Sequence, residues 1–185
     1  MSRSRAVALL ALAVSGLASE ARGSTRESGS EPPASSLRLS AYCLAGADLY
    51  LSSARTAGGV GGGCGVRGTL HERFLLQFDA SYLTLLGNVA SLRVGAGVQR
   101  LGVYAPAAWV MGGALAGQQL RFLAEPGSPL VTGPAPWLGV AVAPLRFRLP
   151  RAEVSVLELG VGVGLESSRA GLLLHLGLLS VGVTP

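Results

Sequence analysis

Between residues 37 and 183 the chain consists of short segments in which apolar residues alternate with small or polar ones. In residues 157–165 every odd position is aliphatic and every even position is Gly or Glu. Residues 91–99 show the same period, with Leu, Val, Ala and Val at the even positions. Successive side chains of a strand point to opposite faces, so a period of two indicates amphipathic strands. The pattern therefore predicts an all-β fold.

Eight such segments follow one another along the chain, and most are separated by short breaks that are typical of turns. The predicted strands cover residues 37–48, 59–70, 74–85, 91–99, 103–119, 137–148, 153–166 and 171–183. Pro106 suggests a bulge or an edge position in the fifth segment, and changes of parity at 156–157 and 179–180 suggest two further bulges. Because closure removes unpaired edges, we predict an eight-stranded antiparallel up-and-down (meander) β-barrel.

The first 36 residues differ from the rest in composition. Arg3 and Arg5 precede an uncharged, apolar stretch over residues 6–17, and small residues that suit cleavage follow it. This is the layout of a secretory signal peptide. We expect a signal peptide over residues 1–21, a flexible polar linker over 22–36, and the barrel domain over 37–185.

The same alternation fits a soluble barrel with its apolar face inward or a membrane barrel with that face outward. Only 14% of the residues are charged, and the mean hydropathy is +0.48. The face opposite the apolar one is rich in glycine. If this face were the outside of a soluble barrel, it would be poorly hydrated. We therefore favour the transmembrane orientation. A soluble lipocalin-like barrel that binds an apolar ligand is the alternative, and the inward or outward direction of Leu92, Val94, Leu159 and Val161 distinguishes the two.

A helical membrane protein is a further alternative, because residues 101–117 and 129–145 are long and nearly uncharged. Prolines within both stretches argue against helices. All fifteen basic residues are Arg, and they do not gather in one run, so we expect no nucleic-acid partner. Two cysteines and two histidines at unrelated spacings give no metal site, and no cofactor motif is present.

Cys43 and Cys64 are the two cysteines of the chain. If the first two strands form a hairpin around residues 52–58, Cys43 lies opposite Cys64, and both thiols point from the apolar face. An exported chain with an even number of cysteines permits a disulfide. The alternative is that both are small, reduced apolar residues.

Several charged residues fall on the polar face and are predicted to point into the lumen; they are Arg38, Arg67, Asp79, Arg93 and Glu158. Such a set forms either a polar conduit or a plug of ion pairs, and the narrow interior of an eight-stranded barrel favours the plug. His175 lies within a predicted strand and, with Ser167 or Ser168 and a Glu, would permit a lipid hydrolase. No nucleophile-elbow pattern supports that reading, so we expect no enzyme activity.

These segments resemble the small eight-stranded outer-membrane barrels, the group that includes the OmpA transmembrane domain and OmpX-like proteins. The resemblance covers residues 37–183 and rests on architecture alone. It implies a porin-like protein in the outer membrane of a Gram-negative bacterium, in contact with lipid, monomeric, and with a structural or surface-interaction role. Loop 121–136 would then be external and contact a partner, and six aromatic residues would form a sparse belt: Tyr42, Tyr50, Tyr82, Tyr104, Trp109 and Trp137.

Overall fold

The computed structural model describes residues 37–53, 55–118, 133–166 and 170–184. The predicted signal peptide and linker, Ser167 and Ser168, and most of loop 121–136 lie outside these residues. Within them, no helix is long and apolar enough to cross a membrane. The two stretches that could have been spanning helices contain strands instead.

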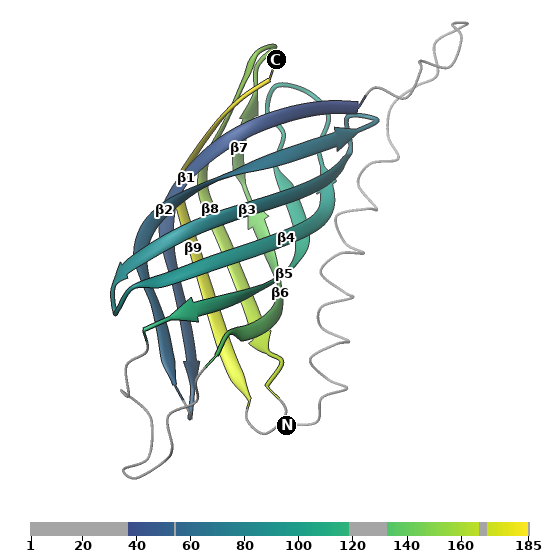
Figure 1. Ribbon diagram of the computed structural model, residues 1–185. Coiled ribbons are helices and arrows are strands. Elements are labelled where there is room, and N and C mark those ends of the chain that lie inside the picture. Colours follow the sequence, from purple (N-terminus) through teal and green to yellow (C-terminus); the bar gives the residue numbers. More distant parts are fainter. Residues whose placement is uncertain (1–36, 54, 119–132, 167–169, 185) are drawn as a thin grey trace, which may run out of the picture. The chain divides into compact units, whose positions relative to one another are not determined.

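The described residues form a single antiparallel sheet of nine strands (Figure 1). The strands are β1 (Leu37–Ser52), β2 (Thr56–Leu70), β3 (Phe74–Leu85), β4 (Val89–Gln99), β5 (Ala107–Gly117), β6 (Ala135–Ala143), β7 (Leu145–Arg148), β8 (Ala152–Gly164) and β9 (Gly171–Val183). Neighbours in sequence pair from β1 to β6, and β9 pairs with both β1 and β8. The sheet closes because β8 also pairs with β6. The predicted closed meander is therefore confirmed.

β6 and β7 together occupy one strand position, so the barrel has eight positions among the described residues. Both strands pair with β8, and Pro144 separates them. Proline has no N–H to donate to a ladder, which explains why the expected continuous strand over 137–148 is divided. Pro106 likewise delays β5 to Ala107, so the predicted start at residue 103 was wrong. Between β4 and β5, strand-like pairing is limited to an isolated bridge between Tyr104 and Phe147.

Bulges account for the changes of parity. Leu157 of β8 has a left-handed backbone (φ 66°) and interrupts the pairing of β8 with β9. In β9 the register against β1 shifts between Leu179 and Gly177, so that Leu178 is the extra residue. The bulge in β8 lies at the predicted place, and the bulge in β9 lies one residue earlier than predicted.

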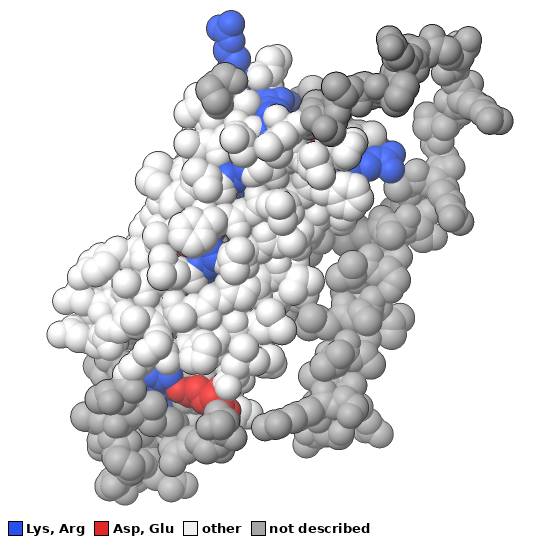
Figure 2. Space-filling model, turned by 45° about the vertical axis from the view of Figure 1, so that its right-hand side comes forward, with Lys and Arg blue, Asp and Glu red and all other residues white. Residues whose placement is uncertain are grey.

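The aliphatic face of the sheet points outward. Leu92, Val94, Leu159 and Val161 are 52%, 60%, 43% and 47% exposed. Most of the wall visible in Figure 2 is free of charged side chains. This orientation is the one expected of a membrane barrel and the opposite of that in a soluble ligand barrel.

The interior contains a mixture of apolar and charged side chains. Trp109 and Trp137 are among its buried residues, together with Tyr42 and Tyr50. The predicted aromatic belt was therefore wrong for these four, and only Tyr82 and Tyr104 of that set face outward. Glycines of the inner face explain the difference, because the Trp109 ring packs over Gly95 and the Trp137 ring over Gly162, where any side chain would take up the space.

Candidate functional site in the barrel lumen

Five ionisable side chains meet near the middle of the lumen, and we call them the lumenal ionic network. They are Asp48 (β1), Asp79 (β3), Arg93 (β4), Glu158 (β8) and His175 (β9). Arg93 Nε donates to Asp79 Oδ1 over 2.6 Å. His175 Nδ1 lies 2.5 Å from Asp48 Oδ1, and its Nε2 lies 3.2 Å from Glu158 Oε1. All five are buried.

Two levels of pairing build this network. Asp79 is directly opposite Arg93 on the neighbouring strand, and Asp48 is directly opposite His175. Period two places all four on the inner face of their strands. The closure of the barrel then joins the two pairs, since Arg93 Nη1 lies 2.8 Å from His175 Nδ1. Tyr42 completes the arrangement by donating its hydroxyl to Asp79 over 2.8 Å.

A second group lies nearer the end of the barrel at which β1 begins. Arg67 Nη1 donates to Glu153 Oε1 over 2.5 Å, and Arg146 Nη2 donates to Glu153 Oε2 over 2.9 Å. Arg67 also donates to the side-chain oxygen of Gln77, and its guanidinium lies 4.3 Å from the centre of the Tyr42 ring. Tyr42 therefore connects the two groups, because it contacts both Arg67 and Asp79.

The charges of the interior are nearly matched. The buried carboxylates are Asp48, Asp79, Glu153 and Glu158, and the buried guanidiniums within the strands are Arg67, Arg93 and Arg146. Both ring nitrogens of His175 lie near carboxylates, and its Nδ1 also lies 2.8 Å from Arg93 Nη1, so three guanidiniums and one imidazole face the four carboxylates. Buried charges are tolerated when each has a partner of opposite sign, and this arrangement provides one.

A third group ties together the opposite end of the barrel. Arg55, in the turn between β1 and β2, pairs with Glu166, which follows β8. Arg55 also donates to the carbonyl oxygens of Gly133 and Pro134, which precede β6. Tyr50 donates its hydroxyl to Glu166 over 3.0 Å. Neither Arg55 nor Glu166 was among the predicted site residues, because both lie next to turns, where no periodicity marks the inner face.

The predicted lumenal residues are placed as follows. Arg67, Asp79, Arg93 and Glu158 belong to the buried groups described above. Arg38 does not: it lies at the mouth, where its guanidinium donates to Thr184 and to the carbonyl oxygens of Leu149 and Pro150. Sequence reasoning missed Asp48, Arg146, Glu153 and His175 as members of the ionic groups. Their position in the alternating pattern was the available signal, since each lies between two apolar residues in the sequence.

Cys43 and Cys64 lie directly opposite each other on β1 and β2 and form a disulfide. The hairpin has the register expected from the sequence, with Leu39 opposite Gly68 and Ala41 opposite Val66. Both cysteines are on the outward face. The disulfide is therefore part of the wall of the barrel and not of the lumenal groups.

Two hollows border the ionic network among the described residues. An open hollow of about 260 Å³ lies beside Arg93, Leu92 and Val94. The free volume that Arg93, Glu158 and His175 border is about 10 Å³. A cavity of this size is at the lower limit for one water molecule. Among the described residues, no group of three or more His, Cys, Asp or Glu side chains is arranged to hold a metal ion. The arrangement can fix strands to one another through charge, and it offers no space at His175 for a substrate.

No protein-family model matches the sequence, and no curated protein matches it either. Solved structures do resemble it in fold. Neisserial surface protein A (NspA) superposes with a TM-score of 0.54 at 13% identity, over 82% of this chain and 99% of that one. The attachment invasion locus protein Ail of Yersinia pestis matches with a TM-score of 0.42 at 10% identity, over 80% and 99% of the two chains. A de novo designed transmembrane β-barrel gives 0.37 at 14%, over 80% and 98%.

The likeness to NspA at this level of identity concerns the fold. It confirms the predicted architecture, which is that of the small eight-stranded outer-membrane barrels.

Proposed function

We propose that the chain is a monomeric, non-enzymatic outer-membrane protein of a Gram-negative bacterium, with a structural or surface-interaction role. Residues 1–21 would direct export and residues 22–36 would link to the barrel. The observation that carries the proposal is the polarity of the barrel, which has exposed aliphatic side chains such as Val94 and Val161 outside and the buried Arg93–Asp79 pair inside. Such a polarity is stable where the outer surface contacts hydrocarbon.

The small free volume between Arg93, Glu158 and His175 supports a structural role over a conducting one. Ions would have to pass between Arg93, His175 and Glu158, where the cavity has a volume of about 10 Å³. His175 contacts two carboxylates and one guanidinium, so its ring nitrogens are already engaged. These contacts support a plug and argue against both a conduit and a hydrolase that uses His175.

Surface interaction is assigned to the end of the barrel with loop 121–136. If the barrel begins on the periplasmic side, the odd-numbered connections are external, and this loop is the fifth. Arg55 fixes the position at which the loop joins β6, because it donates to the carbonyl oxygens of Gly133 and Pro134. An epitope inserted in loop 121–136 should be stained by antibody on intact cells. Staining that requires permeabilised cells would contradict this topology.

Membrane location is tested by expressing the full chain and separating the cell envelope. We expect the protein in the outer-membrane fraction, with heat-modifiable migration in detergent gels. Reconstituted in planar bilayers, it should give no stable conducting state. Recovery as a detergent-free soluble monomer would refute the membrane assignment, and stable ion-sized conductance would refute the plug.

A further inference from the structure

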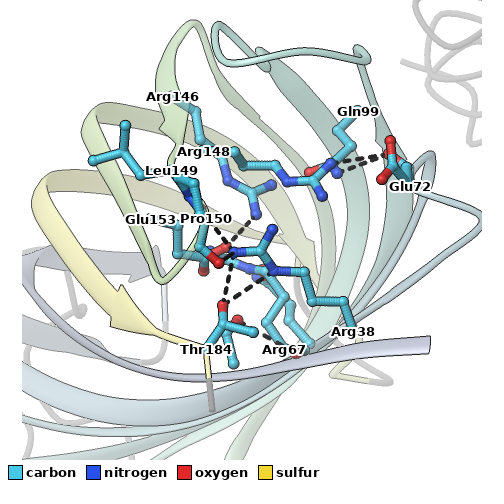
Figure 3. A network of polar contacts seen from close by, with 12 residues as sticks. Arg38, Arg67, Glu72, Gln99, Arg146, Arg148, Leu149, Pro150, Glu153 and Thr184 are labelled. Atoms are coloured by element: carbon cyan, nitrogen blue, oxygen red, sulfur yellow. Dashed lines mark hydrogen bonds and ion pairs between the residues drawn. The ribbon is translucent and has the colours of Figure 1, made fainter. Parts of the chain in front are cut away.

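The end of the barrel at which β1 begins carries an excess of guanidinium groups, which we call the arginine vestibule. It consists of Arg38, Arg67, Arg146 and Arg148 around Glu153 (Figure 3). We propose that the arginine vestibule is a binding site for a phosphate oxyanion, either free or in a lipid headgroup. This site is separate from the lumenal ionic network and does not depend on the proposed surface role.

The arginine vestibule has a surplus of positive charge. Glu153 is the carboxylate that Arg67 and Arg146 share, and it cannot balance both. Arg38 binds carbonyl and hydroxyl oxygens, which carry no formal charge. Arg148 donates to the main-chain oxygen of Glu72. Four cations and one anion give the vestibule a formal charge of about +3, counting each guanidinium as charged. Part of this charge offsets the lumenal carboxylate of Glu158, which acts on Arg67.

Arg146 provides a buried guanidinium with unused donors. The Arg146 side chain is 0% exposed, yet its Nε and Nη1 have no hydrogen-bond partner among the described residues. A buried donor without an acceptor is costly, and the cost is larger for a charged group. Arg146 thus has two donor nitrogens, Nε and Nη1, available for an anion in addition to the Nη2 that binds Glu153.

Two of the four arginines of the vestibule are accessible to solvent. Arg38 and Arg148 are only half-buried, and they lie at the mouth above the fully buried Arg67 and Arg146. Arg38 comes from β1, Arg67 from β2, and Arg146 and Arg148 from β7, and Figure 3 shows these side chains extending across the mouth, so an anion can be met from more than one side. Long arginine side chains can move at a mouth more easily than groups fixed in the interior.

Further cations surround the mouth. Arg73, Arg100 and Arg151 are exposed at the turns of the same end, because each even-numbered connection of a meander returns to that end. Glu72 is exposed among them, so these turns carry three guanidiniums and one carboxylate, and a surplus of one sign concentrates ions of the opposite sign. Guanidinium groups match phosphate in geometry as well as in charge, which favours a phosphate oxyanion over chloride.

The test uses the full-length folded protein in maltoside micelles at constant ionic strength. Calorimetric titration with inorganic phosphate should give saturable binding. Native mass spectrometry of the same protein, loaded with phosphatidylglycerol or with phosphatidylcholine, should show which lipid is retained. Binding of phosphate alone identifies a free anion as the ligand, and preferential retention of phosphatidylglycerol identifies a headgroup. The proposal is overturned if neither probe binds in this way.

Matched variants distinguish specific binding in the vestibule from a general attraction of anions by net charge. Arg148→Gln should weaken binding about tenfold, because it removes a charge-assisted donor from the vestibule. Arg100→Gln removes the same charge from the rim and should change binding less than threefold. Arg38→Gln provides a second vestibule variant if Arg148→Gln does not fold. Equal weakening by vestibule and rim variants would show that the anion is attracted by net charge and not held at this site.

Discussion

Arg93 Nε donates to Asp79 Oδ1 over 2.6 Å, and the two residues lie directly opposite each other on β4 and β3. Both are buried, at 3% and 0% exposure. Arg93 also contacts His175 on the opposite side of the barrel. It therefore connects the β3–β4 hairpin to β9 across the lumen.

Breaking the Asp79–Arg93 pair should strongly destabilise the barrel. We expect Arg93→Met or Asp79→Asn to lower the free energy of unfolding by about 3 kcal/mol or more, because each leaves a buried polar group without its partner. The measurement is urea unfolding of the refolded protein in micelles or vesicles. The double variant should lose clearly less than the sum of the two single losses. Strictly additive losses would mean that the two side chains do not stabilise each other.

If the outward face contacts lipid, the cost of placing a charge on it should depend on the depth of the residue in the bilayer. Val94 lies in the middle of β4 and Val183 at the end of β9, and they are 60% and 63% exposed. In lipid vesicles, Val94→Arg should cost about 2–4 kcal/mol and Val183→Arg about 1 kcal/mol or less, since charge is costly only near the bilayer midplane. Denaturant unfolding in vesicles measures both values. A soluble barrel would tolerate the two changes equally well.

The disulfide should stabilise the hairpin of β1 and β2. Cys43 and Cys64 are separated by 21 residues, and closing a loop of that length limits the unfolded chain. We expect the double change Cys43→Ala and Cys64→Ala to lower stability by about 3 kcal/mol. Denaturant midpoints with and without reductant provide the comparison, and the double variant should not respond to reductant. Alkylation of free thiols in the untreated protein would show that the bond does not form.

Much of the wall could be predicted from the sequence. Period two identifies the inward and outward faces without knowledge of neighbours, and the register of the first hairpin follows from the distances of Cys43 and Cys64 to the turn. The breaks at Pro106 and Pro144 were less clear. Each proline removes one ladder donor, but whether a strand bends, divides or starts late depends on the neighbouring strand.

The lumen was harder to predict, because its contacts cross the barrel. Arg93 and His175 are 82 residues apart, and they meet only after β8 and β9 complete the ring. No local pattern says how far the strands are staggered, and that stagger decides which inward residues face each other. Trp109 and Trp137 were misplaced for a related reason. Aromatic residues are common at membrane interfaces, but here inner-face glycines make room for them inside.

Inner-face glycines lead to a last prediction, which concerns Tyr50. This tyrosine is fully buried and donates to Glu166, and a Cβ at Gly164 would overlap its hydroxyl group. Gly164→Ala should therefore displace the ring, lose the hydrogen bond and destabilise the barrel by about 1–3 kcal/mol. Gly68→Ala is the matched control, because a Cβ there would meet Leu37 and Leu39 side chains at an ordinary 3.6 Å.

Unfolding in urea compares the two alanine variants in the same vesicles. Tyr50→Phe tests whether the overlap causes the loss of stability, because it removes the hydroxyl that overlaps the new methyl group. If the overlap causes the loss, Gly164→Ala should cost less in the Tyr50→Phe background than in the original protein. An unchanged cost would show that the hydroxyl of Tyr50 is not the group that the new methyl displaces. Equal stability of the Gly68 and Gly164 variants would show that Tyr50 does not pack against this part of the wall.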